Sequence, residues 1–151
     1  MSSPALQTTI RLSNFYVTRL EFKMDSGAGS RPVGEGDPLK IELEQKIGLP
    51  QTPQNSFIVI FDLKLTDEES GSISLSLQAV AEFQTSVPVD ADFGATSYVQ
   101  VSGPAIAFPF LRSYVHTVTM HSGAPGIILP ALNFTVPKAQ GPPKPTTESK
   151  T

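Results

Sequence analysis

Apolar and polar residues alternate along four stretches of the chain, and this period of two predicts β-strands with one buried face. The four expected strands are Thr9–Lys23, Leu39–Leu43, Phe57–Leu65 and Ile73–Phe83. Glycine-rich, proline-containing and acidic turn segments separate them. Consecutive strands joined in this way favour an antiparallel sheet with one apolar face and one mostly polar face.

The first strand contains two exceptions to the alternation. Phe15 and Val17 share the parity of the charged residues Arg11 and Arg19, so we expect them on the outward face of the sheet. Apolar side chains there indicate either cross-strand pairing or contact with a second subunit. Under the second interpretation, the candidate interface residues are Phe15, Val17, Leu75 and Leu77.

After a turn-rich stretch at 88–104, a helical period begins near Ala105. One apolar stripe with the spacing i, i+3, i+4, i+7, i+8 and i+11 contains Ala107, Phe110, Leu111, Tyr114, Val115 and Val118. Pro109 is compatible with this helix only if it lies in the first turn. Gly123 is the expected stop, with His121 in the last turn. The pattern therefore predicts one amphipathic helix that covers the apolar face of the sheet.

The chain offers little catalytic chemistry. It has no cysteine, and its two histidines, His116 and His121, are five residues apart, roughly 140° around a helix. They cannot bind one metal ion from one helix face. Ser113 and His116 are three apart, but no nucleophile-elbow motif surrounds the serine. We expect no enzyme, no metal and no cofactor.

Charge and hydropathy exclude two further classes of protein. The net charge of −3 and the lack of a Lys/Arg cluster argue against nucleic-acid binding. No apolar run approaches the ~20 residues of a membrane span, and the first residues lack a signal-peptide pattern, so a soluble cytoplasmic protein is expected. Residues 138–151 are rich in Pro, Lys and Thr and are expected to be a disordered tail after a domain at 1–137.

The stretch "AFPFLRSYVHTVTMHSGAPGIILPALNF" resembles the C-terminal motif of SecB, a tetrameric export chaperone. In that family a helix opens with Phe-Pro-aromatic-x-Arg, and a Gly-x-Pro turn leads to an apolar run closing in Asn-Phe. The matching positions are Phe108, Pro109, Phe110, Arg112, Gly123, Pro125, Leu129, Pro130, Asn133 and Phe134. The likeness extends over about Ile10 to Phe134, with "RLSNFYVTRLEF" and "DPLKIEL" similar to the first two strands of the family.

The resemblance implies an α+β fold with a four-stranded antiparallel sheet, a principal helix on one face and a dimer of dimers. It implies a chaperone that holds unfolded or precursor polypeptides in hydrophobic grooves without ATP. The groove positions that it implies here are Leu39, Ile41, Leu43, Phe108, Phe110 and Tyr114.

The chain also departs from the family. Acidic residues of the family that engage the basic tail of the motor SecA correspond here to Arg19 and Lys23, with Ser76 at a third position. Like charges repel, so we expect little binding to SecA. The prolines after Asn133-Phe134 predict loss of the second C-terminal helix of the family. The alternatives to export are a chaperone of a toxin–antitoxin system and an adaptor that binds one folded partner.

Overall fold

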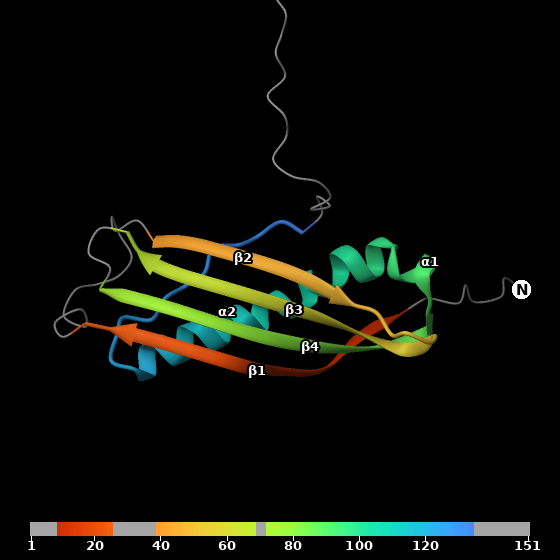
Figure 1. The fold of residues 1–151 in the computed structure, drawn as a ribbon, viewed down its shortest axis with the longest axis horizontal. Coiled ribbons are helices and arrows are strands. Elements are labelled where there is room, and N and C mark those ends of the chain that lie inside the picture. Colours follow the sequence, from red (N-terminus) through yellow and green to blue (C-terminus); the bar gives the residue numbers. More distant parts are fainter. Residues whose placement is uncertain (1–8, 26–38, 69–71, 135–151) are drawn as a thin grey trace, which may run out of the picture.

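The computed structural model describes residues 9–25, 39–68 and 72–134. Its four strands are β1 (Ile10–Met24), β2 (Leu39–Gly48), β3 (Gln54–Asp67) and β4 (Ile73–Val89). They are followed by a short helix, a π-helical turn and the main helix, which are α1 (Ala91–Gly94), η2 (Tyr98–Ser102) and α2 (Gly103–His121). Helix α2 lies across one face of the sheet, behind it in Figure 1. The expected α+β fold, a four-stranded antiparallel sheet with one principal helix, is confirmed.

The strand order is β1-β4-β3-β2, with every neighbouring pair antiparallel. β3 and β4 occupy the centre, so their inward side chains form the core with α2. The largest fully buried side chains are Phe61, Phe83, Leu63, Leu65, Ile73, Leu75, Leu77, Leu111, Ile127, Leu129, Val59 and Val89. All four strands extend further than the sequence predicts at their carboxyl ends. The expected tail at 138–151 and the expected loss of a second C-terminal helix concern residues outside the described ranges.

Two β-bulges in β1 overturn one expectation. The pairing of β1 with β4 shifts register around Ser13 and again around Thr18, where two β1 residues oppose one. Each shift exchanges the two faces of the strand. As a result Phe15 and Val17 lie on the helix-covered face, packed against the core, and the expectation that they point outward is wrong. The ring of Phe15 lies 6.0 Å from the ring of Phe110 on α2.

The other two candidate interface residues are buried within the chain itself. Leu75 is 1% exposed and Leu77 is 0% exposed, both beneath the helix in the centre of the sheet. They present no surface to a second subunit, so their assignment to an interface is corrected. The cause is their place on the central strand β4, whose inward face α2 covers.

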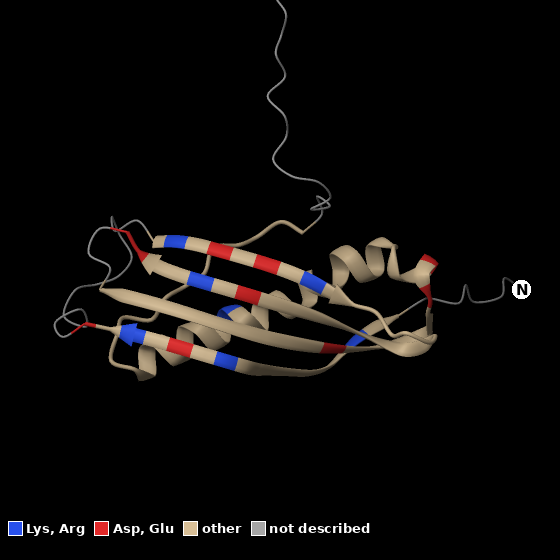
Figure 2. Cartoon of the chain, viewed as in Figure 1, with Lys and Arg blue, Asp and Glu red and all other residues tan. Residues whose placement is uncertain are grey.

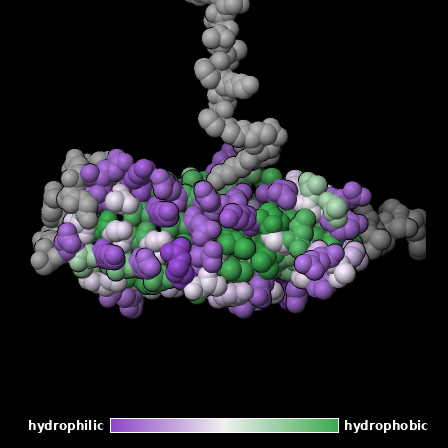
Figure 3. Space-filling view, in the orientation of Figure 1, coloured by the Kyte–Doolittle hydropathy of each residue, from purple (hydrophilic) through white to green (hydrophobic). Residues whose placement is uncertain are grey.

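The helix-free face of the sheet is mostly polar, as expected, with one apolar row. Tyr16, Val80 and Ile60 are register neighbours on β1, β4 and β3 and form this row. Figure 3 shows this face with an apolar area near its centre between polar borders. Residues of both signs are interspersed along the strands around it, so neither sign dominates (Figure 2).

Helix α2 begins earlier than its sequence predicts. It starts at Gly103, with Pro104 in its first turn, and therefore places Pro109 inside the helix instead of in the first turn. Pro109 cannot donate a hydrogen bond to the carbonyl group of Ala105. The end is as expected: the helix stops at His121, and Gly123 adopts a φ of 87° that favours glycine.

The chain then turns back along α2 and is attached to it by Thr119, a fully buried polar residue of the helix. The Thr119 hydroxyl group donates to the carbonyl oxygen of Val115 at 2.8 Å. The hydroxyl oxygen of Thr119 also accepts a hydrogen bond from the backbone N–H of Ile127 at 2.9 Å. The backbone N–H of Ala124 donates to the carbonyl group of Thr119 at 3.2 Å. These contacts fix the direction of residues 124–134, which we call the covering segment.

We predict that Thr119→Val lowers the free energy of unfolding by about 1–3 kcal/mol. Valine has the shape of threonine but leaves the buried N–H of Ile127 without an acceptor. Denaturant unfolding followed by far-UV circular dichroism measures the change. Thr117→Val is the control, because Thr117 is exposed on the same helix. Equal stability of the two variants would contradict the role given to the Thr119 hydroxyl group.

Candidate functional site

The covering segment separates two adjoining pockets. The helix pocket, about 500 Å³, lies between the segment and the first half of α2. The strand pocket, about 370 Å³, lies between the segment and β2. Leu132 and Phe134 belong to the walls of both. Because an apolar segment follows the helix and its turn in the sequence, two neighbouring pockets form on one side of the molecule.

The helix pocket has an apolar floor and a polar wall. Phe108 lies in the floor, and its ring packs 5.5 Å from the ring of Phe134 at an interplanar angle of 60°. The first and last aromatic residues of the SecB-like motif are therefore in contact. Arg112, Ser113 and His116 form the polar wall along α2. No Asp or Glu lines this pocket among the described residues.

Edge strand β2 lines the strand pocket. Its residues alternate, so that Ile41, Leu43 and Gln45 turn toward the helix-covered side. Pro130 and Asn133 of the covering segment face them. Gln45 is the one polar side chain that β2 contributes to this wall, among two apolar neighbours.

Two buried side-chain atoms have no hydrogen-bond partner among the described residues, and each belongs to one of these pocket walls. They are the Oε1 atom of Gln45 and the Nδ1 atom of His116. A buried polar atom without a partner costs about 1–3 kcal/mol, and such atoms are uncommon in folded proteins. Each of the two pocket walls therefore contains one buried polar atom that the described residues leave without a partner.

The position of His116 depends on a glycine of the covering segment. A Cβ atom built on Gly126 would lie 2.3 Å from Cε1 and 2.6 Å from Nδ1 of His116. Any other residue at position 126 would displace the imidazole ring from its place against the segment. Gly126 thus sets the shape of the helix pocket at its polar end.

The structure brings together three of the six groove residues expected from sequence. Ile41 and Leu43 line the strand pocket, and Phe108 lines the helix pocket. The other three line neither: Leu39 lies at the start of β2, and Phe110 is on the β1 side of α2, where it meets Phe15. Tyr114 follows Phe110 by one helical turn and packs against the core. Client binding by these six residues stays a prediction.

Sequence reasoning missed Gln45, His116 as a pocket residue, and Leu132. Gln45 and His116 contain the two buried atoms that have no hydrogen-bond partner among the described residues. Leu132 is 41% exposed and lies between the two pockets. A signal for Gln45 existed: it continues the inward parity of Leu39, Ile41 and Leu43 beyond the expected end of that strand. The other two acquire their positions only through the return of the chain after α2.

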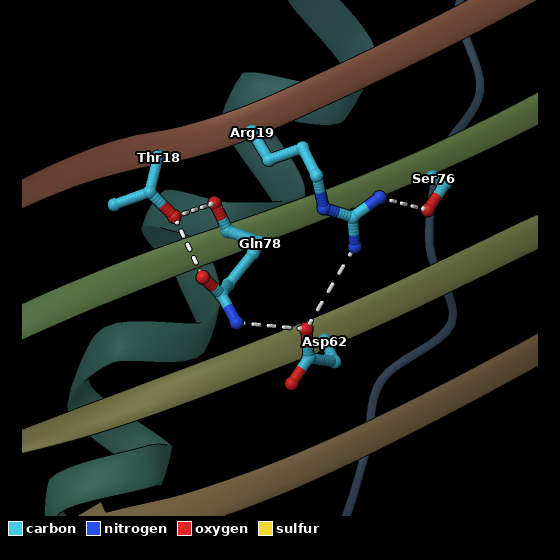
Figure 4. A network of polar contacts seen from close by, with 5 residues as sticks. All are labelled: Thr18, Arg19, Asp62, Ser76 and Gln78. Carbon is cyan, nitrogen blue, oxygen red and sulfur yellow. Dashed lines mark hydrogen bonds and ion pairs between the residues drawn. The ribbon is translucent and has the colours of Figure 1, made fainter.

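The helix-free face holds the positions compared with the SecA-binding acids. The Arg19 guanidinium donates to Ser76 Oγ at 2.9 Å and lies 4.0 Å from the Asp62 carboxylate (Figure 4). Gln78 Nε2 donates to Asp62 at 3.2 Å, and Thr18 Oγ1 donates to Gln78 Oε1 at 2.9 Å. This network lies on the opposite side of the sheet from the pockets. Weak binding to SecA stays a prediction.

One side chain of this face has a perturbed pKa. Partial burial, followed by the hydrogen bond to the Glu82 carboxylate and its charge, raises the pKa of Tyr16. The phenol donates to Glu82 Oε1 at 3.2 Å. The Tyr16 hydroxyl therefore stays protonated and serves as a donor on the sheet surface.

Within 9–25, 39–68 and 72–134, no three His, Asp or Glu side chains gather as a metal site. In the same ranges, no helix is both long and apolar enough to cross a membrane.

Comparison with solved structures shows that the fold is similar to that of one SecB-like chaperone. The SecB-like chaperone Rv1957 of Mycobacterium tuberculosis, solved with a ChAD peptide from the HigA1 antitoxin, superposes with a TM-score of 0.62. It shares 16% identity over 83% of this chain and 88% of that chain. A protein of unknown function from Streptococcus agalactiae gives a TM-score of 0.53 at 12% identity, covering 82% and 98% of the two chains.

At the sequence level, an uncharacterized protein of Methanocaldococcus jannaschii, MJ0357, is 24% identical over 130 residues. The alignment covers 82% of this chain and 79% of that protein. No known protein-family profile matches the sequence. The comparisons therefore show a shared fold.

We predict that Gln45→Leu does not lower the free energy of unfolding and raises it by up to about 1 kcal/mol. The substitution removes a buried oxygen that has no donor among the described residues and places an apolar side chain of similar size in the wall. Gln78→Leu is the control, because Gln78 has partners on both sides in the network of Figure 4. The Gln78→Leu substitution should lower the free energy of unfolding by about 1 kcal/mol. Chemical denaturation measures both, and a loss for Gln45→Leu as large as that for Gln78→Leu would contradict the assignment.

Proposed function

We propose that this chain is an ATP-independent chaperone that holds unfolded polypeptides, binding their apolar segments in the helix and strand pockets without chemical change. The observation that carries the proposal is the pair of adjoining, mainly apolar pockets that share Leu132 and Phe134. The fold shared with a SecB-like chaperone supports it.

The binding energy would come from many small contributions. Each buried CH₂ group contributes about 0.8 kcal/mol, and an unfolded chain carries several apolar segments. Ile128, 65% exposed, and Leu132, 41% exposed, present apolar surface in the pocket walls to such segments. Contacts of this kind add up along one chain without requiring a particular sequence.

Polar groups in the pocket walls fit the same ligand. An extended polypeptide carries a backbone N–H and C=O at every residue. The exposed Ser113 hydroxyl group in the wall of the helix pocket would form hydrogen bonds with the backbone of a client. Such bonds are independent of the client side chains, as a chaperone for many clients requires.

We also propose that the chains assemble along β1, in the manner of the tetrameric chaperone that the sequence resembles. β1 is a long edge strand, and an open edge of this length favours pairing with another strand. Leu20 of β1 and Phe110 of α2 are both exposed, Phe110 by 50%. Phe110 would then serve assembly instead of client binding.

Two client pathways remain as proposals. Protein export follows from the SecB resemblance, whereas the antitoxin peptide bound by the M. tuberculosis chaperone favours a toxin–antitoxin system. The genes beside this one separate the two, because an adjacent toxin–antitoxin pair would support the second. Tight, salt-sensitive binding to SecA would support the first.

We predict that the purified protein suppresses aggregation of a chemically denatured client at near-stoichiometric ratio without nucleotide. Light scattering of the diluted client measures this. Leu132→Gln should weaken client binding about tenfold, because about 1.5 kcal/mol of apolar burial is lost.

Met120→Gln is the matched control for that substitution. Met120 is similarly exposed but lines neither pocket, so its replacement should leave suppression unchanged. Failure of the wild-type protein across several clients would overturn the chaperone proposal. Capture of one folded partner, with no affinity for unfolded chains, would favour an adaptor.

A separate prediction concerns assembly. Multi-angle light scattering should give a mass above that of the 16.2 kDa monomer for the wild type, and Phe110→Ser should shift it toward the monomer. Met120→Ser removes an equally exposed apolar side chain near the end of the helix and should keep the wild-type mass. A wild-type monomer at all concentrations would contradict assembly.

A further inference from the structure

Arg112 is the only formally charged residue in a long part of the chain. From Phe93 to Phe134 the sequence contains no other Asp, Glu, Lys or Arg. This part includes α2 and the whole covering segment, which are almost free of charge colours in Figure 2. The charges of the sheet lie mainly on its helix-free face. Helix α2 and the covering segment therefore carry one formal charge, that of Arg112.

Arg112 lies in the wall of the helix pocket and is exposed. Its guanidinium group makes no hydrogen bond or ion pair with the described residues. Arg19, on the other face, is different, because it has Asp62 and Ser76 as partners. Arg112 is thus available to a molecule that enters the pocket.

The surroundings of Arg112 favour an anionic partner. Ser113 and His116 beside it are hydrogen-bonding groups, and neither described pocket wall contains a carboxylate. A guanidinium group binds a carboxylate through two parallel hydrogen bonds, which are stronger than bonds between neutral groups. An apolar pocket reduces the screening of this contact by water. A lysine or arginine of a client placed there would be repelled.

We propose, on the basis of the proposed function, that the helix pocket selects polypeptide segments in which an acidic side chain stands beside apolar ones. The carboxylate group binds Arg112 at the rim, while the apolar neighbours occupy the floor formed by Phe108 and Phe134. The net charge of the whole chain, −3, acts in the opposite direction and attracts basic clients. It acts over distances beyond about 10 Å, where salt at 0.1 M screens it, so contact with Arg112 decides the preference in the bound state.

Three labelled peptides test the inference. They share one apolar sequence and differ at a single central position, which carries Glu, Gln or Lys. Fluorescence anisotropy at 0.1 M salt measures their dissociation constants for the wild type, Arg112→Gln, Arg112→Glu and the control Lys64→Gln. Lys64 is an exposed cation on the helix-free face of β3.

The wild type should bind the Glu peptide about two- to fivefold more tightly than the Lys peptide, the size of a partly exposed ion pair. Arg112→Gln should remove the difference and Arg112→Glu should reverse it, whereas Lys64→Gln should keep the wild-type order. Binding of all three peptides with an order unaffected by Arg112→Glu would overturn this inference and leave the proposed function standing. If none of the three peptides binds, both this inference and the proposed function are overturned.

Discussion

The hydrogen bond between the backbone N–H of Ile127 and the hydroxyl group of Thr119 decides how the helix-covered side is built. The chain leaves α2 through a turn at Gly123 and has to pass back over the sheet. A buried acceptor on the helix fixes where Ile127 lies. Ile127 and Leu129 then point into the core and Ile128 points away from it. The two pockets on either side of the covering segment follow from this one attachment.

The covering segment is needed because one helix cannot cover this sheet. At about 1.5 Å per residue, the 19 residues of α2 span about 28 Å, whereas the 17 residues of β4 extend for about 56 Å. A helix about 10 Å wide is also narrower than four strands spaced about 4.8 Å apart. The covering segment covers part of the sheet face that α2 leaves open beside β2. Because this segment has no regular secondary structure, it packs less completely than a helix. Hollows lined with apolar side chains are the geometric result.

The sequence predicts the fold well where the alternation is regular. In β3 and β4 every inward residue from Phe57 to Leu65 and from Ile73 to Phe83 is assigned correctly, because no bulge interrupts the pairing of these two strands there. β1 fails at Phe15 and Val17, because an extra residue at a bulge reverses parity without changing composition. The bulges are visible only in the pairing with β4, where the hydroxyl groups of Ser13 and Thr18 donate to backbone carbonyl groups. The pocket residues His116 and Leu132 depend on tertiary contacts, which no periodicity encodes.

The pockets are where this chain departs from the rules that the rest of it follows. Elsewhere, polar groups such as Thr119 and Gln78 have partners. In the pocket walls, the described residues leave buried atoms of Gln45 and His116 without a hydrogen-bond partner and supply no anion to Arg112. Local departures of this kind lower stability and are expected mainly at functional sites. Gln45, His116 and Arg112 all lie in the walls of the pockets that the proposed function assigns to client binding.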